Sequence, residues 1–217
     1  PLTGPYDTRD INIIEYQVAL MKVSGIDGVI FDWYGIEDAL DYEEIHESTL
    51  EVINVLRKAG LKYAICYEDQ SIGKMIEAGN FEKKDALSYG EKVFDYMEKN
   101  WFNDEAYLKY EGRPVVYTFG PQFFFNKEQW DTLFSHCSNR PYLITLEGHS
   151  ENFADGSYNW FNMDGKKTIP QVVKQLNNFY QRQNDKTFLT ATVYSGFHDI
   201  YAEAGGKSYG YLNCYEG

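Results

Sequence analysis

Three carboxylates follow short runs of β-branched and aromatic residues, at the points where those runs end. They are Asp32, Glu68 and Glu147. Carboxyl groups in such positions can act as general acids, as bases, or as acceptors for the hydroxyl groups of sugars. We therefore take Glu68 and Glu147 as candidate catalytic residues and Asp32 as a candidate substrate-binding residue. The structural alternatives are a helix cap for Glu68, a salt bridge for Glu147 and a turn residue for Asp32.

Aromatic residues lie beside these carboxylates. The chain holds 19 Tyr, 14 Phe and 4 Trp, and core packing explains most of them. Rings near a strand end can pack on the apolar face of a sugar. The candidate substrate-binding residues of this kind are Trp33, Tyr34, Tyr67 and Trp160, and His198 joins them as a polar ring.

Several other chemistries lack their sequence signals. No Gly-x-Ser-x-Gly elbow is present, which disfavours a serine hydrolase, and no metal-ligand spacing such as His-Glu-x-x-His occurs. No glycine-rich phosphate loop follows any apolar run. The three cysteines, Cys66, Cys137 and Cys214, are far apart and predict neither disulfides nor a zinc site. We expect no cofactor and no metal.

The candidate residues are positioned by alternating strands and helices. The predicted strands are Val29–Phe31, Tyr63–Cys66, Val115–Thr118, Tyr142–Leu146, Tyr158–Phe161 and Leu189–Tyr194. The predicted helices span residues 10–24, 42–59, 71–79, 83–100, 126–136 and 168–182. We expect Asp7 or Thr8 to cap the first helix and Gly60 to end the second.

This alternation predicts a parallel α/β sheet with its functional groups at the carboxyl ends of the strands. The choice is between an open doubly wound sheet and a (β/α)8 TIM-type barrel. Polar residues at several strand ends favour the barrel, because barrels build one site from many strands. We expect the candidate carboxylates and rings to converge around a single cleft.

The composition sets further limits. A chain of 217 residues predicts one domain, residues 1–217, and its net charge of −13 argues against nucleic acid and anionic membrane surfaces. No apolar run is long enough to span a membrane, and we expect no signal peptide within these residues. The chain starts at Pro1 rather than at methionine, so we expect a processed product or an excised piece.

Six stretches carry a resemblance to a known family: Gly4–Asp7, Glu15–Lys22, Gly25–Tyr34, Ala59–Asp69, Gly112–Val115 and Asp155–Trp160. In this order and spacing they resemble the glycoside hydrolase family 71/99-like proteins, which include endo-α-mannosidases, over nearly the whole chain. The resemblance implies a (β/α)8 barrel that acts on polysaccharide, possessing a catalytic Glu-x-x-Glu pair after the last barrel strand, and a secreted or periplasmic location.

No such Glu-x-x-Glu phrase follows the last predicted strand of this sequence. Its six strands correspond to the second to seventh of a barrel, so the first and the last are expected outside it. We therefore expect a glycoside hydrolase-like barrel that binds an oligosaccharide or polysaccharide, and whose open edges pair with another segment or copy. Two alternatives stay open: a non-catalytic carbohydrate-binding barrel, and a glycan-assembly protein related to glycosyltransferases.

Overall fold

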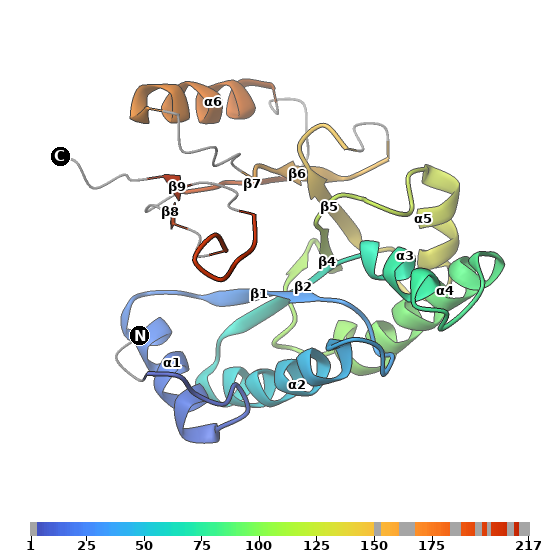
Figure 1. Cartoon of the computed structure of the whole chain (residues 1–217), viewed down its shortest axis with the longest axis horizontal. Helices are drawn as coiled ribbons and strands as arrows, with labels where there is room; N and C mark the ends of the chain where they lie inside the picture. The colour runs from blue at the N-terminus through green and yellow to red at the C-terminus, as the bar shows by residue number, and fades with distance from the viewer. Residues whose placement is uncertain are drawn as a thin grey trace.

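The fold is built on a parallel sheet (Figure 1). The computed structural model describes residues 4–149, 153–160, 168–182, 188–193, 197–198, 201–207 and 211–212. Six strands pair in parallel in the order of the sequence: β1 (Gly28–Trp33), β2 (Lys62–Tyr67), β4 (Arg113–Thr118), β5 (Tyr142–Leu146), β6 (Gly156–Tyr158) and β7 (Phe188–Thr190). The predicted parallel sheet is therefore confirmed.

Some strand boundaries differ from the prediction. The fifth parallel strand begins at Gly156 rather than at Tyr158, and the sixth ends at Thr190, so Thr192 lies beyond it. Three short antiparallel strands were not predicted, because two residues give no readable alternation. They are β3 (Lys109–Tyr110), which pairs with β4, and β8 (Phe197–His198), which pairs with β9 (Tyr211–Leu212).

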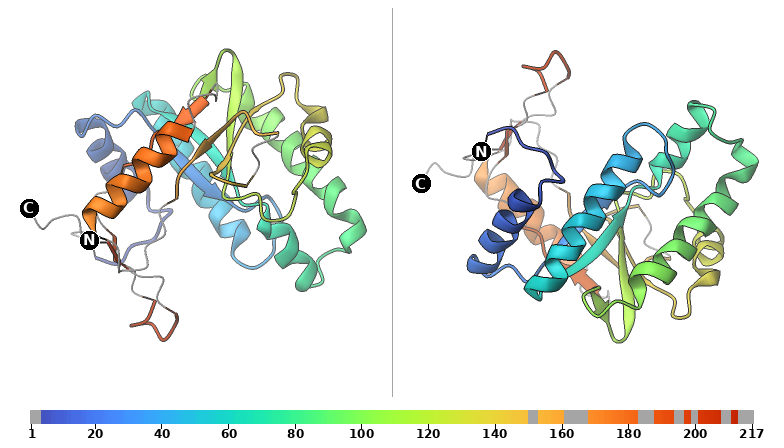
Figure 2. Two further views of the ribbon diagram at one scale, coloured as in Figure 1. Left: turned by 90° about the horizontal axis from the view of Figure 1, so that it is seen from above. Right: turned by 90° about the horizontal axis from the view of Figure 1, so that it is seen from below.

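Helices surround the outside of the curved sheet (Figure 2). They are α1 (Ile11–Val23), α2 (Tyr42–Ala59), α3 (Gln70–Glu77), α4 (Ala86–Met97), α5 (Lys127–Leu133) and α6 (Ile169–Arg182). Single turns of other helix types flank some of them: η1 (Lys83–Asp85), η2 (Glu98–Phe102) and η3 (Phe134–His136). Within the described residues, none of the helices combines the length and apolar character that crossing a membrane requires.

The helix ends follow local sequence chemistry. Asp10, rather than Asp7 or Thr8, caps α1, since its carboxylate accepts the backbone N–H of Asn12 at 2.9 Å. Asp7 instead accepts the backbone N–H of Arg9 in the preceding turn. At the end of α2, Gly60 takes the left-handed conformation, with φ of 69°, as predicted.

The alternation of side chains divides the interior into two clusters. On the helix side of the sheet, strand residues such as Ile65 and Val116 join the main core with the inward faces of the helices. On the concave side, a smaller cluster forms from Ala64, Cys66, Val115, Tyr117, Tyr142 and Ile144. A two-sided core of this kind is what a barrel wall requires.

The barrel does not close within the described residues. Along the sheet path β1 pairs with β2 alone and β7 pairs with β6 alone. On β1 the concave-side residue Ile30 is 49% exposed, although its neighbours in the chain contact the main core. The architecture is thus an open parallel barrel wall, as expected for an incomplete barrel.

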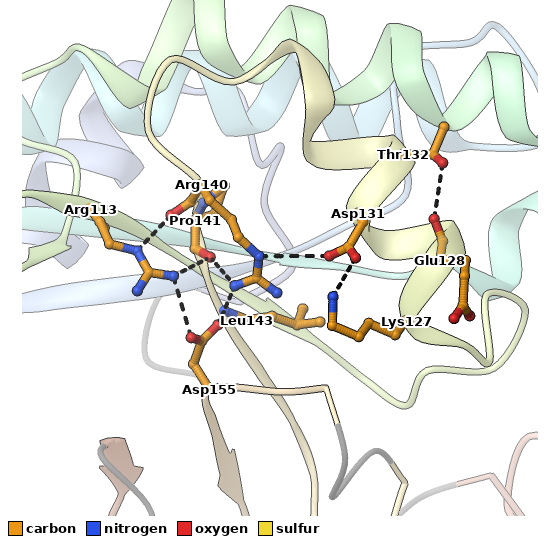
Figure 3. Close-up of polar contacts among 9 residues, drawn as sticks. All are labelled: Arg113, Lys127, Glu128, Asp131, Thr132, Arg140, Pro141, Leu143 and Asp155. Atoms are coloured by element: carbon orange, nitrogen blue, oxygen red, sulfur yellow. Dashed lines mark hydrogen bonds and ion pairs between the residues drawn. The ribbon is translucent and has the colours of Figure 1, made fainter.

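A carboxylate ties together the amino ends of three strands (Figure 3). Asp155, just before β6, accepts hydrogen bonds from Arg140 at 2.8 Å, from Arg113 at 3.3 Å and from the backbone N–H of Leu143 at 3.0 Å. The Arg113 guanidinium also lies 3.7 Å over the ring of Tyr142. Groups at the amino ends of barrel strands serve stability, so we separate this network from the site at the opposite ends.

Candidate active site

Asp32 and Glu68 lie side by side at the carboxyl ends of β1 and β2. The register pairs Asp32 with Cys66, and the backbone N–H of Glu68 donates to the carbonyl oxygen of Trp33 at 2.9 Å. Since Cys66 faces the concave side, the strand alternation sends Asp32 and Glu68 to that side as well. The predicted convergence of these two carboxylates is thus present in the structure.

The environment of Glu68 favours its protonated form. The side chain is buried, with 3% of its surface exposed. Burial raises the pKa of Glu68 to about 8, and a hydrogen bond and charge from Asp32 add to the rise, although a hydrogen bond from Gln70 opposes it. The Gln70 amide donates to Oε2 of Glu68 at 2.6 Å. Glu68 therefore holds its proton at neutral pH, beside a second carboxyl group.

Tyr34 completes this group. Its hydroxyl donates to Oδ2 of Asp32 at 3.2 Å. Its ring stacks on Tyr42 from α2, with 5.1 Å between ring centroids and 10° between ring planes. Burial, followed by the charge of Asp32, raises the pKa of Tyr34, so the phenol stays protonated and remains a donor. The predicted placement of Tyr34 beside Asp32 is present.

Tyr158 is a neighbour of this group that the sequence analysis did not select. Its hydroxyl donates to the carbonyl oxygen of Thr118 at 3.3 Å and lies 4.0 Å from Sγ of Cys66. Burial raises the pKa of Tyr158, and the nearby Cys66, Glu68 and Asp32 add to the rise. Its position in the Asp155–Trp160 stretch was the only available signal, and that stretch gives no side-chain direction.

Glu147 has different partners from Glu68. Its Oε2 accepts a hydrogen bond from the side-chain amide of Asn159 at 2.8 Å. Leu146 pairs with Tyr158, which faces the concave side. Glu147 and Asn159 are the next residues along, so the alternation of side chains directs them away from the concave side. Both candidate catalytic residues thus lie beyond strand carboxyl ends, but each is bonded into its own local group.

Trp160 is the exposed ring at this edge. Its side chain is 61% exposed, and it meets Phe119 edge to face, with 5.2 Å between ring centroids. An exposed indole braced by a second ring is suited to packing against an apolar ligand face. The backbone of His198 lies in β8, and its side chain lies outside the part of the chain that the structure describes.

Two of the predicted substrate-binding rings require correction. Trp33 and Tyr67 are fully buried, each with 0% of its surface exposed, and both belong to the main core on the helix side. Their rings pack on one another and, for Tyr67, on Phe94 of α4. Neither ring can stack on a sugar in this structure. From the helix side of the sheet they support the strand ends that carry the neighbouring site residues.

Asp69, next to Glu68, anchors a loop. Its carboxylate accepts the backbone N–H groups of three consecutive residues, Gln122, Phe123 and Phe124, each at 2.8 Å. The side chain is completely buried. The loop after β4, from which Phe119 reaches Trp160, is therefore fastened to the loop that carries Glu68.

Comparisons with known proteins give one family match and several matches to solved structures. Residues 2–215 match the family described as Glycosyltransferase WbsX. Among curated proteins, none matches this chain. A solved glycoside hydrolase-like protein aligns with a TM-score of 0.63 and 14% identity. The alignment covers 83% of this chain and 59% of the solved protein.

Two solved structures of the GH99 endo-α-mannosidase from Bacteroides thetaiotaomicron are also similar. The first has a TM-score of 0.64 and 18% identity and covers 92% of this chain and 58% of its own. The second, in complex with bis-tris-propane, has a TM-score of 0.64 and 17% identity. Its alignment covers 96% of this chain and 66% of the mannosidase chain. At these identities the likeness shows the fold, and this chain spans about three-fifths of the length of the solved proteins.

Proposed function

Since the chain belongs to the family described as Glycosyltransferase WbsX, and its fold is that of the glycoside hydrolase-like barrels, we propose that it binds a neutral glycan of the α-mannan type. The binding site is the group at the carboxyl ends of β1 and β2, formed by Asp32, Tyr34, Glu68 and Gln70. One observation carries this proposal. Glu68 is buried, which raises its pKa, and it lies beside a second carboxyl group.

This pair suits sugar hydroxyl groups. A protonated carboxyl group both donates and accepts hydrogen bonds, and an ionised one accepts only. Glu68 and Asp32 together therefore offer a donor and several acceptors in one place. Glu68 also has the protonation state that a general acid needs at neutral pH, which is the role we propose for it in any hydrolysis.

Hydrolysis requires a second carboxylate farther away. In retaining glycosidases the two carboxyl groups are about 5–5.5 Å apart, and in inverting enzymes about 6.5–9.5 Å. Asp32 and Glu68 lie on adjacent strands, close enough for Asp32 to raise the pKa of Glu68, so they are too close to flank a glycosidic bond. Glu147 follows β5 with the alternation opposite to the concave side, so it does not provide this second carboxylate beside Glu68. No Glu-x-x-Glu phrase of the kind that the family resemblance implies follows the last predicted strand. We therefore propose glycan binding for this chain and glycosidase chemistry for a closed barrel.

The family description favours a second candidate, a glycosyltransferase that uses a nucleotide-sugar. The charge of the site opposes this candidate. Asp32 is exposed beside the buried Glu68, and a diphosphate placed against the Asp32 carboxylate would be repelled. A neutral oligosaccharide carries no such penalty.

Calorimetry distinguishes the two candidates. An α-mannan oligosaccharide and a nucleotide-sugar are titrated separately into the chain at pH 7. We expect a binding isotherm with the oligosaccharide and none with the nucleotide-sugar. Binding of the nucleotide-sugar alone would overturn the glycoside hydrolase-like proposal and support the transferase.

A further inference from the structure

A histidine on α2 supports the end of β1 from its helix side. We propose that His46 is a positioning residue: by accepting the indole N–H of Trp33 it fixes the strand end that presents Asp32 to Glu68. This inference rests on the proposed function of the Asp32–Glu68 pair as the glycan site. His46 acts on the site only through Trp33.

The contacts of His46 are specific. Nε1 of Trp33 donates to Nδ1 of His46 at 3.2 Å, and Nε2 of His46 lies 3.2 Å from the hydroxyl oxygen of Tyr96 on α4. The rings of Trp33, Tyr96 and Trp101 enclose the imidazole, with ring centroids 5.8, 5.2 and 6.1 Å from it. The histidine thus joins α2 and α4 to the end of β1.

These contacts determine the tautomer. An indole N–H can only donate, so Nδ1 of His46 must be the acceptor and carries no proton. The neutral ring therefore has its proton on Nε2, directed toward the hydroxyl oxygen of Tyr96. Burial lowers the pKa of His46, although the charge of Glu47 on the same helix opposes this. Tyr96 faces it from α4 as a phenol whose pKa is raised by burial, so it stays uncharged.

Protonation of His46 would break this arrangement. A second ring proton would place the Nδ1–H against the indole N–H of Trp33, and two donors cannot form a hydrogen bond. The buried indole would then lose its acceptor, and the cost of an unpaired buried N–H would favour a movement of Trp33. Only the neutral histidine holds the tryptophan in place.

Trp33 transmits its position to the site through the backbone. Its two neighbours in the chain are Asp32 and Tyr34, which are hydrogen-bonded to each other at 3.2 Å. Its own carbonyl oxygen accepts the backbone N–H of Glu68 at 2.9 Å. A displaced Trp33 would therefore separate Asp32 from Glu68 and admit water to Glu68.

The titration of Glu68 tests this inference without any ligand. The side-chain carboxyl carbons of glutamate are labelled with carbon-13, and the Glu68 signal is assigned by its absence in Glu68→Gln. Its pKa is measured by NMR in the wild-type chain and in Trp33→Phe, His46→Leu and His46→Gln. Trp33→Phe removes the donor, and His46→Leu removes the acceptor. His46→Gln supplies an uncharged acceptor for Trp33 and a donor for Tyr96.

We expect the pKa of Glu68 to fall by about one unit or more in Trp33→Phe and His46→Leu, because water reaches the carboxyl group. We expect the wild-type value in His46→Gln. Tyr107→Phe is the matched control, since it removes a buried hydroxyl that donates to the carbonyl of Val115 at 3.0 Å, away from Trp33. It should lower stability and leave the titration of Glu68 unchanged.

Two results would overturn the inference. One is a wild-type titration of Glu68 in both Trp33→Phe and His46→Leu. The other is an equal shift in Tyr107→Phe, which would mean that any loss of stability loosens the site. If His46→Leu does not fold, Trp33→Phe still decides the outcome. Failure of glycan binding would refute the proposed function. The titration uses no ligand, so it would still test the role of His46.

Discussion

The backbone N–H of Glu68 donates a hydrogen bond to the carbonyl oxygen of Trp33, with 2.9 Å between the two atoms. This bond extends the pairing of β1 and β2 one residue beyond β2, which ends at Tyr67. It places the Glu68 carboxyl group against that of Asp32 on the concave side, while the indole of Trp33 is buried on the helix side. One strand end thus has a polar face for a ligand and an apolar face for support.

The raised pKa of Glu68 predicts a stability that depends on pH. The folded chain holds this proton up to about pH 8, and the ordinary value is 4.5. Between these values the folded state binds the proton that the unfolded state has released, so the free energy of unfolding falls as pH rises. The slope reaches at most about 1.4 kcal/mol per pH unit. The contribution of this proton to the free energy of unfolding is complete below pH 4.5 and is lost by about pH 8.

Glu68→Gln removes this proton and therefore this slope. Urea unfolding from pH 5 to pH 8.5 should show wild type losing stability relative to Glu68→Gln as the pH rises. Taking the difference between the two proteins cancels the groups that titrate independently of Glu68. Parallel pH profiles would show that Glu68 titrates normally.

Glu68→Gln should also retain glycan binding at pH 7. A glutamine side chain donates and accepts as a protonated carboxyl group does, so the hydrogen bonds of the neutral Glu68 are preserved. We expect the dissociation constants of wild type and Glu68→Gln, measured by calorimetry, to agree within about threefold at pH 7, which is less than 1 kcal/mol. At pH 9 the wild type alone should bind more weakly. Strong weakening at pH 7 would mean that Glu68 acts as an ionised acceptor.

Asp69→Asn should destabilise the chain by about 3 kcal/mol or more, since three N–H groups lose a charged acceptor and one of them meets an amide N–H₂. Amide hydrogen exchange should accelerate at the residues that Asp69 holds, 122–124. Asp95→Asn is the control, because Asp95 forms an exposed pair with Lys99 at 2.6 Å, and such pairs contribute less than about 1 kcal/mol. Equal losses in the two variants would refute the anchoring role.

Asp155→Asn should lower the free energy of unfolding by about 1–3 kcal/mol, because two guanidinium groups and one backbone N–H lose their ionised partner. The same substitution at Asp131, an exposed carboxylate on α5 that pairs with Lys127 and lies 3.9 Å from Arg140, is the comparison (Figure 3). Its effect should stay below about 1 kcal/mol. Denaturant unfolding measures both, and glycan affinity should be unchanged in the folded Asp155→Asn protein. Loss of affinity there would place this network in the binding site.

Most of the fold was predictable because β1, β2, β4 and β5 carry apolar runs. Gly60 ends α2 at the predicted residue because the left-handed conformation there favours glycine. The start of α1 was less certain, since several residues before it can cap a helix, and Asp10 is the one whose carboxylate reaches Asn12. The end of β7 was missed because Leu189–Tyr194 stays apolar and aromatic beyond the last paired residue, Thr190.

The site was predictable as a set of strand ends, but the direction of each side chain was not. Trp33 and Tyr34 are adjacent aromatic residues, yet one is buried in the core and the other faces Asp32. Their directions depend on the register of β1 against β2, which a single strand sequence does not contain. The register of β1 against β2 places Glu68 beside Asp32, and the separate register of β5 against β6 places Glu147 beside Asn159.

The most direct test of glycan binding at the Asp32–Glu68 pair is calorimetry with an α-mannan oligosaccharide at pH 7. The titration compares wild type with Glu68→Ala and Asp32→Ala, and with Glu128→Ala on α5 as the control. We predict that each site variant binds about tenfold or more weakly, a loss of about 1.4 kcal/mol or more, and that the control binds as wild type does. Wild-type affinity in both site variants, or no binding by the wild-type chain, would contradict the account.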